Sequence, residues 1–145
     1  MSIRLSSILF EGEDKPVILY HGTKAKYVPE ILRSGLLAAK SKSSLEAVFL
    51  TDDIGMARNY TLMDMEKGDK PVVLAIDVSK LDQDKLGPDN YELQQFLDGE
   101  MGDVPEELEG MSWNDLSWKE SLQYVNQAAY HGDIPPEALS VARRL

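Results

Sequence analysis

One segment, residues 71–78 (PVVLAIDV), limits the possible folds of this chain more than any other. Its β-branched and apolar residues continue over the length of a strand, which is typical of a strand near the centre of a sheet. Shorter apolar segments that can form further strands lie at residues 17–20 (VILY), 47–50 (AVFL) and 127–131 (QAAYH). The sequence therefore predicts a sheet that is built from several short strands.

Two helices are predicted in the first half of the chain. In residues 28–34 apolar side chains recur at helical spacing, and Gly35 is a suitable residue to end the helix. A second helix is expected to begin after Asp52 or Asp53, since either side chain can act as its N-cap. One side of this helix should hold Ile54, Ala57 and Thr61, with Arg58 on another side.

The second half of the chain is less regular. Residues 91–97 and 113–122 predict two short helices, with an acidic loop at 99–110 between them. After the strand at 127–131, the two prolines at 135–136 are expected to block further strand pairing, because proline has no backbone N–H to donate. Strands and helices in this order predict the α+β class.

The length of 145 residues indicates a single domain that covers residues 1–145. No repeat or low-complexity linker divides it. Residues 1–14 are expected to form an N-terminal arm, and residues 88–119 an acidic insertion.

The content of cysteine and histidine excludes several kinds of chemistry. The chain has no cysteine and two histidines, which rules out disulfides and thiol catalysis and argues against a zinc site. No apolar run approaches the length of a membrane span, and residues 1–12 lack the long apolar core of a signal peptide. These features predict a cytoplasmic protein without a metal or a membrane partner.

The net charge of −10 is unevenly distributed. Residues 1–45 carry seven basic and four acidic side chains, a local charge of +3, whereas residues 88–119 carry nine acidic and one basic, a local charge of −8. The total argues against a general nucleic-acid surface, which needs clustered lysine and arginine. A small anionic ligand is expected near the first region. The alternative is that the lysines and the acidic stretch are ordinary solvated surface.

The triplet His21-Gly22-Thr23 follows the first expected strand and precedes the first expected helix. At the end of a strand, side chains and open backbone groups can face a ligand, so the triplet is a candidate site. A lone His-Gly-Thr is weak evidence for any one function.

Three segments, in order, resemble the catalytic core of ADP-ribosyltransferases of the diphtheria-toxin and poly(ADP-ribose) polymerase type: HGT with the following ILRSGL, then VFLTDDIGMARNY, then PVVLAIDV. The strand PVVLAIDV and the closing DIPPEAL are also similar to RNA 2′-phosphotransferases, which share that fold and use NAD. The resemblance covers residues 17–79 and, less closely, 127–139. It implies a split β-sheet with short helices, and NAD as a substrate.

The resemblance implies roles for five residues. His21 takes the place of a histidine that hydrogen-bonds the NAD ribose beside the nicotinamide, and Gly22 the place where backbone groups hold the nicotinamide carboxamide. Thr23 stands where the family has Ser or Thr. Phe49 replaces a strand tyrosine, and Tyr60 matches the tyrosine that stacks on the nicotinamide ring. The alternative for the two aromatic residues is a place in the core.

This chain departs most from the family at a third motif, which follows those of His21 and of Tyr60 in the chain. Many such transferases carry a glutamate at the start of a late strand, where it contacts the ribose 2′-hydroxyl. Here Gln127 is best placed, and Gln123 and Glu120 are the alternatives. Glutamine accepts a hydrogen bond but carries no charge for a developing oxocarbenium ion. This argues against the elongation of poly(ADP-ribose).

Cleavage of NAD sets further requirements. The nicotinamide–ribose bond breaks through an oxocarbenium-like transition state, so the site must hold a flat ring, its carboxamide and the ribose hydroxyls. It should also offer positive potential to a pyrophosphate, without any need for a metal. This potential is expected from some of Lys24, Lys26, Arg33, Lys40 and Lys42.

From these features the function predicted first is an NAD-dependent mono-ADP-ribosyltransferase that acts on an unidentified protein or nucleic acid. An RNA 2′-phosphotransferase is ranked lower, because that family carries an N-terminal basic module and arginines that hold the RNA 2′-phosphate, and this chain is acidic. A third interpretation is a non-catalytic NAD-binding or interaction domain on the same fold. The sequence does not specify the oligomeric state.

Three conspicuous residues lie outside these motifs. His131 is expected to be a half-exposed structural residue on the late strand. Trp113 and Trp118 are expected to anchor the acidic insertion to the core.

Overall fold

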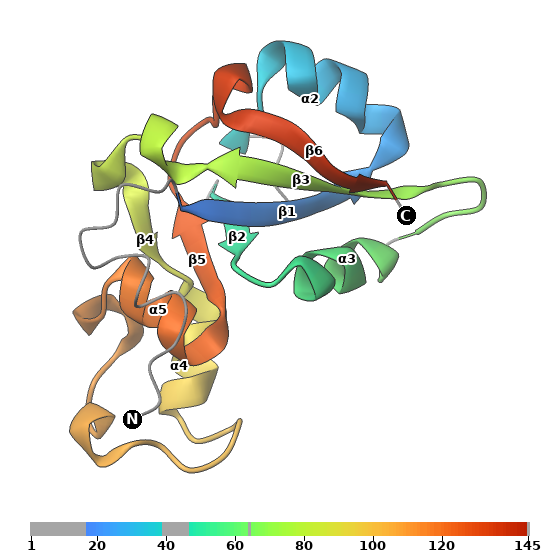
Figure 1. The fold of residues 1–145 in the computed structure, drawn as a ribbon. Helices are drawn as coiled ribbons and strands as arrows, with labels where there is room; N and C mark the ends of the chain where they lie inside the picture. Colours follow the sequence, from blue (N-terminus) through green and yellow to red (C-terminus); the bar gives the residue numbers. More distant parts are fainter. Residues whose placement is uncertain (1–16, 39–46, 64, 145) are drawn as a thin grey trace.

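The computed structural model describes residues 17–38, 47–63 and 65–144, which form an α+β fold around a six-stranded antiparallel sheet (Figure 1). The strand order is β4-β5-β2-β1-β3-β6. The strands are β1 Ile18–Lys24, β2 Val48–Thr51, β3 Pro71–Asp77, β4 Leu86–Pro88, β5 Gln127–Tyr130 and β6 Leu139–Arg144. The α-helices are α2 Val28–Ser34, α3 Ile54–Leu62, α4 Asn90–Leu97 and α5 Trp118–Val125. The predicted fold class is confirmed.

β3 is the strand that was predicted from residues 71–78, and it lies inside the sheet. It pairs with β1 from Ile18↔Asp77 to Lys24↔Pro71, and with β6 on its other edge. Its apolar side chains are buried on both faces, which explains the unbroken apolar sequence.

The sheet is nearly divided between β1 and β2. In the described residues these two strands pair at one position, Tyr20↔Thr51, whereas β2 pairs with β5 along its whole length. Beyond Tyr20, β1 continues beside β3, while β2, β5 and β4 run in a clearly different direction (Figure 1). One edge of β1 therefore has no strand beside it from His21 onward in the described part of the sheet.

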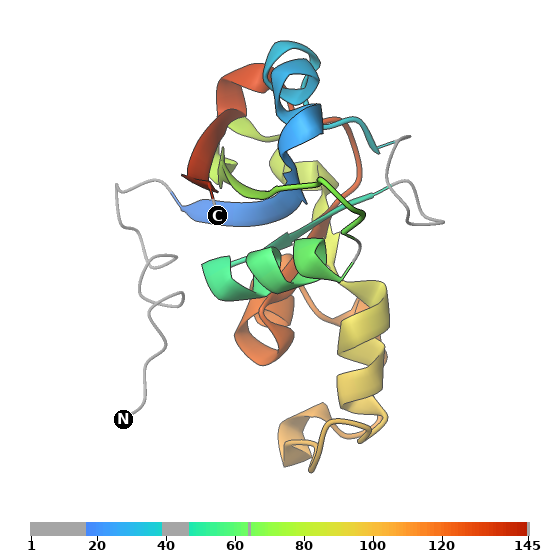
Figure 2. The same cartoon turned by 90° about the vertical axis from the view of Figure 1, so that its right-hand side faces the viewer.

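Helices α2 and α3 lie on opposite sides of β1 and β3 (Figures 1 and 2). α2 packs Val28 and Ile31 against the main hydrophobic core. α3 approaches β1 very closely at Gly22. A Cβ atom added to Gly22 would lie 2.0 Å from Thr61 Oγ1 and 2.1 Å from the Ala57 carbonyl oxygen. Glycine is therefore required here for α3 to pack on the strand.

The ends of these helices follow the predicted signals. Gly35 ends α2 with a φ angle of 93°. Asp53, rather than Asp52, caps α3, and its Oδ1 accepts two backbone N–H groups of the first turn at 2.9 and 3.2 Å. Within α3, Ala57 and Thr61 are buried and Arg58 is exposed, as predicted.

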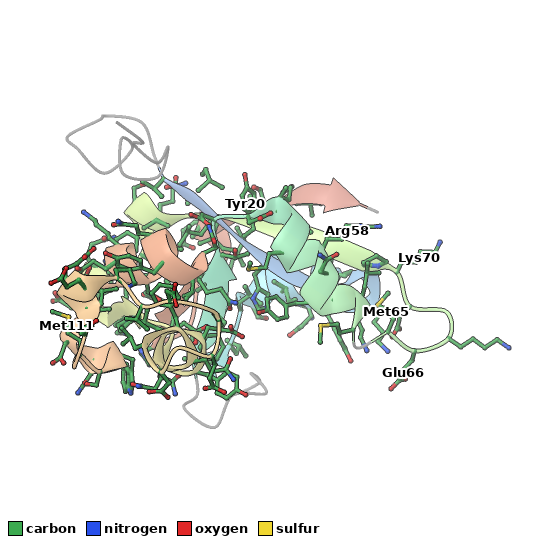
Figure 3. The ribbon with its side chains drawn as sticks, turned by 90° about the horizontal axis from the view of Figure 1, so that it is seen from below. Tyr20, Arg58, Met65, Glu66, Lys70 and Met111 are labelled. Atoms are coloured by element: carbon green, nitrogen blue, oxygen red, sulfur yellow. The ribbon has the colours of Figure 1, made fainter. Side chains whose placement is uncertain are left out.

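The acidic segment 88–119 contains α4 and the two 3-10 turns Glu106–Leu108 and Trp113–Asp115. A second hydrophobic cluster joins it to α5, with Leu93, Leu108, Leu116 and Val125 buried. Trp113 packs on this cluster and Trp118 on the main core, so the two tryptophans anchor different clusters. Seen from below, α3 lies between Met111 of this segment and the turn that carries Glu66 and Lys70 (Figure 3).

Several predicted boundaries are wrong. β1 does not end at Tyr20 but continues to Lys24, so the triplet 21–23 lies within a strand. The helix expected at 113–122 is a 3-10 turn followed by α5, because Ser117 caps a new helix. The prolines at 135–136 lie at a 3-10 turn that precedes β6, so they remove no ladder hydrogen bond and pairing resumes after them.

β4 was not predicted. His131 lies one residue beyond the end of β5 and is exposed. The predicted N-terminal arm at 1–14, Lys40 and Lys42 lie outside the described residues. Within the described ranges, no helix is long and apolar enough to span a membrane.

Candidate functional site

A cavity of about 940 Å³ lies where β1 and β2 separate. Residues of α2, β1, β2, α3, the start of α4 and β5 line it. The structure brings together at this cavity all six residues of the predicted site, His21, Gly22, Thr23, Phe49, Tyr60 and Gln127. The volume is in the range that is typical of small-molecule sites.

The backbone of β2 holds His21 in one tautomer. Its Nδ1 lies 2.8 Å from the carbonyl oxygen of Phe49, and since a carbonyl can only accept, Nδ1 carries the proton. Burial lowers the pKa of His21 below the ordinary value of 6.5, and the hydrogen bond to Phe49 opposes this more weakly. At neutral pH the ring is therefore uncharged, and its Nε2 is a hydrogen-bond acceptor.

Gly22 directs its backbone toward the open edge of β1. The carbonyl of Val17 and the N–H of Ala25 both form hydrogen bonds on the β3 side, at 3.0 and 2.7 Å. Backbone groups of successive strand residues alternate between the two edges, so those of Gly22 point, like those of Tyr20, to the β2 side. β2 has already turned away there. A donor and an acceptor on one residue therefore face the split in the sheet, and Thr23 lines the cavity beside them.

Three side chains from different elements form a hydrogen-bond chain at the cavity. Gln127 of β5 donates through Nε2 to the Tyr60 hydroxyl of α3 at 2.6 Å. The hydroxyl in turn lies 3.5 Å from Oε1 of Glu92 on α4, a long hydrogen bond. Burial raises the pKa of Tyr60, so its hydroxyl keeps the proton that it can donate. Gln127 is 6% exposed and the Tyr60 residue 45%.

Glu92 is the main site residue that the sequence analysis missed. Burial raises its pKa, the charge of Asp89 adds to this effect, and the Tyr60 hydroxyl opposes it. Asp89 is the N-cap of α4 and is also buried at the cavity, which raises its pKa. The stretch from Asp89 to Glu92 carries the signal of a helix start, but a single sequence does not indicate that this start lies against β5.

Ser121 connects the start of α4 to the start of β5. This fully buried serine of α5 accepts the backbone N–H of Asp89 at 3.0 Å and donates to the carbonyl oxygen of Gln127 at 2.6 Å. Two segments that contribute side chains to the cavity thus share one hydroxyl. This fixes the position of the Glu92 backbone relative to that of Gln127.

The two alternatives for the third motif do not line the cavity. Glu120 lies in the first turn of α5, where Oε1 accepts the N–H of Ser117 at 3.0 Å in a capping box. Gln123 lies further along the same helix. Of the three candidates, Gln127 alone is among the described lining residues.

Three of the five basic residues that were expected to supply positive potential are paired with carboxylates. Lys24 and Lys26 each lie 3.0 Å from a carboxylate oxygen of Asp69. Arg33 forms an ion pair with Glu30 on the same helix. Their charges are largely balanced by carboxylates, because α2 and the turn before β3 supply acidic partners that sequence spacing did not indicate.

The described lining is acidic. It contains the carboxylates of Glu30, Asp89 and Glu92, and Lys24 is its one lysine or arginine. Within the described ranges, no group of three histidine, aspartate or glutamate side chains is arranged to hold a metal ion.

The fold and the site define an α+β protein with a ligand-sized cavity at a split antiparallel sheet. No family model matches the chain. Over 62 residues it is 45% identical to a probable RNA 2′-phosphotransferase of Trichormus variabilis. The matched segment covers 43% of this chain and 30% of that protein, so the chain spans less than a third of the relative's length. The chain is thus similar, over part of its length, to a transferase.

Proposed function

We propose that this protein is an NAD-dependent transferase that breaks the nicotinamide–ribose bond, with a 2′-phosphate on RNA as the acceptor. The observation that carries the proposal is the assembly of His21, Gly22, Tyr60 and Gln127 around one cavity at the split in the sheet. The 45% identity to a probable RNA 2′-phosphotransferase supports this acceptor. The RNA 2′-phosphotransferase, which was ranked below the mono-ADP-ribosyltransferase from the sequence, is thus placed first here.

The groups at the cavity suit the nicotinamide riboside part of NAD. The N–H and C=O of Gly22 match the carbonyl and the amide N–H of a carboxamide. The unprotonated Nε2 of His21 can accept a hydrogen bond from a ribose hydroxyl. The rings of Phe49 and Tyr60 offer faces for a flat heteroaromatic group.

The proposed reaction is a glycosyl transfer. The C–N bond between ribose and nicotinamide breaks, its electron pair leaves with neutral nicotinamide, and positive charge develops on the ribose. An anionic phosphate oxygen then forms the new C–O bond with its own electron pair. No proton transfer is required for this step. The contribution of the protein is to orient the ribose, exclude water and stabilise the positive charge.

One observation favours a second candidate, ADP-ribosyl transfer to a protein side chain. The described lining carries three carboxylates and no arginine. Such a wall repels a phosphate dianion and suits a neutral or cationic nucleophile. Both candidates share the cleavage of NAD and differ in the acceptor.

A single assay separates these functions. The protein is incubated with NAD and one of two RNA oligonucleotides of identical sequence, one with an internal 2′-phosphate and one with a 2′-hydroxyl. The expected result is release of nicotinamide with the first RNA alone, and ADP-ribose joined to the 2′-phosphate of that RNA. Release without RNA, together with ADP-ribose on protein, would support the second candidate. Binding of NAD without release would identify a non-catalytic domain. His131→Ala, which changes an exposed histidine away from the cavity, is the matched control for folding and handling.

A further inference from the structure

The proposed chemistry needs negative charge close to the ribose, and Gln127 cannot supply it. The nearest carboxylate in the hydrogen-bond chain belongs to Glu92, which reaches the same tyrosine from α4. α4 lies in the segment that the sequence analysis treated as an acidic insertion. This segment therefore contributes directly to the cavity.

We propose that Glu92 is the carboxylate of this site and that, through Tyr60, it orients the Gln127 amide so that the amide oxygen accepts a hydrogen bond from a ribose hydroxyl. The inference rests on the proposed cleavage of NAD and extends it to a residue outside the motifs of the sequence. Glu92 is a positioning residue for Gln127.

The direction of the hydrogen bonds follows from the chemistry of each group. An ionised carboxylate can only accept, so the Tyr60 hydroxyl directs its hydrogen to Glu92. The Tyr60 oxygen is then an acceptor, so the NH₂ group of Gln127 must face it. In the structure, Nε2 of Gln127 lies 2.6 Å from this oxygen. The amide oxygen of Gln127 is therefore turned away from the Tyr60 hydroxyl.

This amide oxygen has no partner among the described residues. Gln127 lines the cavity and is 6% exposed, and the structure gives its Oε1 no hydrogen bond to a described residue. A buried acceptor of this kind normally has a donor. A ribose offers hydroxyl donors of the required type, so the unsatisfied oxygen points to a ligand that bears hydroxyl groups.

The network is built into the fold. Ser121 holds the backbones of Asp89 and Gln127 together, and the Asp89 carboxylate accepts the backbone N–H of Glu92 at 2.9 Å. The backbone of Glu92 is thereby anchored within the first turn of α4. Among the described residues, the ionisable groups that act on Glu92 are Asp89, the N-cap of the same helix, and Tyr60 on α3.

The first test is spectroscopic and requires no turnover. In the protein labelled with ¹⁵N, the side-chain amide signals of Gln127 are followed from pH 3 to 8 by NMR. The expected result is a shift whose midpoint is the pKa of Glu92, above its ordinary value of 4.5. Glu92→Gln and Tyr60→Phe should each abolish this shift. A shift that persists in Glu92→Gln, or signals in the wild type that do not respond to pH, would overturn the proposed orientation.

The second test uses steady-state release of nicotinamide from NAD, with 2′-phosphorylated RNA as acceptor. Glu92→Gln should lower kcat roughly 100-fold, the scale of one preorganised electrostatic group, and change KM by less than roughly threefold.

A double variant tests whether a carboxylate at position 127 can replace Glu92. As a single change, Gln127→Glu should not raise kcat, because the carboxylates of residues 92 and 127 would compete for the one hydroxyl donor of Tyr60. In the Glu92→Gln background, however, Gln127→Glu should recover kcat to within roughly tenfold of the wild type. Glu109→Gln, an exposed residue of the acidic segment, is the control for the loss of one charge.

The outcomes distinguish this inference from the proposed function. If the wild type releases nicotinamide and Glu92→Gln is equally active, the inference is wrong and the proposed function stands. If the wild type releases none with either RNA, the proposed function fails, and the NMR titration alone decides how the Gln127 amide is oriented. If Glu92→Gln does not fold, Glu92→Ala and Tyr60→Phe provide the same comparison.

Discussion

The Nδ1–H of His21 donates to the carbonyl oxygen of Phe49 at 2.8 Å, so a backbone group of β2 determines the tautomer of a side chain on β1. These are the two strands that separate one residue earlier in β1. The contact thus spans the opening of the cavity and leaves Nε2 as an acceptor at its wall. The role implied for His21 by family resemblance stays a prediction, and it requires an acceptor nitrogen of this kind.

Replacement of His21 by alanine should abolish nicotinamide release while the protein remains folded. Burial holds the pKa of His21 below 6.5, so the wild type should keep its neutral ring, and its activity, as the pH falls to 6.5, and lose both further below. The ¹⁵N shifts of the ring should identify Nε2 as the unprotonated nitrogen at neutral pH. His131→Ala should leave turnover unchanged. Normal turnover in folded His21→Ala would remove His21 from the site.

Replacement of Gly22 by alanine should destabilise the fold before it affects a ligand. The added Cβ would lie 2.1 Å from the carbonyl oxygen of Ala57, a backbone atom that cannot move without shifting α3. The expected loss is about 3 kcal/mol or more of the free energy of unfolding, the upper range for overpacking. Gly87→Ala, another strand glycine, has its nearest neighbour at 3.4 Å and should cost less than about 1 kcal/mol. Urea denaturation compares the two variants, and equal stabilities would refute the close approach.

Asp69 should contribute to the pH dependence of the stability of the protein in acid. It accepts the N–H of Glu66 and pairs with Lys24 and Lys26, and these contacts lower its pKa from 3.8 to about 2. Because the folded-state pKa is the lower one, the stabilisation is fully present above pH 3.8 and is lost as the pH falls toward 2. In Asp69→Asn, stability should therefore depend less on pH between 4 and 2. Denaturation curves at several pH values test this, and parallel pH profiles for both proteins would contradict it.

The sequence predicted those features that are determined locally. The central strand at 71–78, the helices on either side of residue 50 and a cap at Asp52 or Asp53 depend on residue type and on neighbours within a few positions. The triplet His21-Gly22-Thr23 lines one cavity, and its role as a site stays a prediction, but its strand was ended too early. Gly22 was interpreted as part of a strand end, whereas its small size is required by contact with α3, which begins more than 30 residues later.

Features that depend on contacts between distant segments could not be predicted. Nothing near Glu92 in the sequence indicates that Ser121 draws the start of α4 against β5. Likewise, the spacing of Lys24 and Lys26 suggested cations that are available to an anionic ligand, but Asp69 pairs with both. A local charge count describes composition, whereas the partner of each charge is set by the folded chain.

Replacement of Ser121 by alanine should separate the two halves of the candidate site. The hydroxyl satisfies two backbone groups in a fully buried position, the N–H of Asp89 and the C=O of Gln127. Loss of the hydroxyl leaves both without a partner, at an expected cost of roughly 2 kcal/mol in the free energy of unfolding. The start of α4 should then move relative to β5, and the Gln127 side-chain signals should no longer follow the titration of Glu92. Ser117→Ala on the same helix removes an N-cap, which should cost about 1 kcal/mol but leave the coupling between Glu92 and Gln127 intact. The same loss of coupling in both variants would mean that the stability of α5, and not the shared hydroxyl of Ser121, holds Glu92 at the cavity.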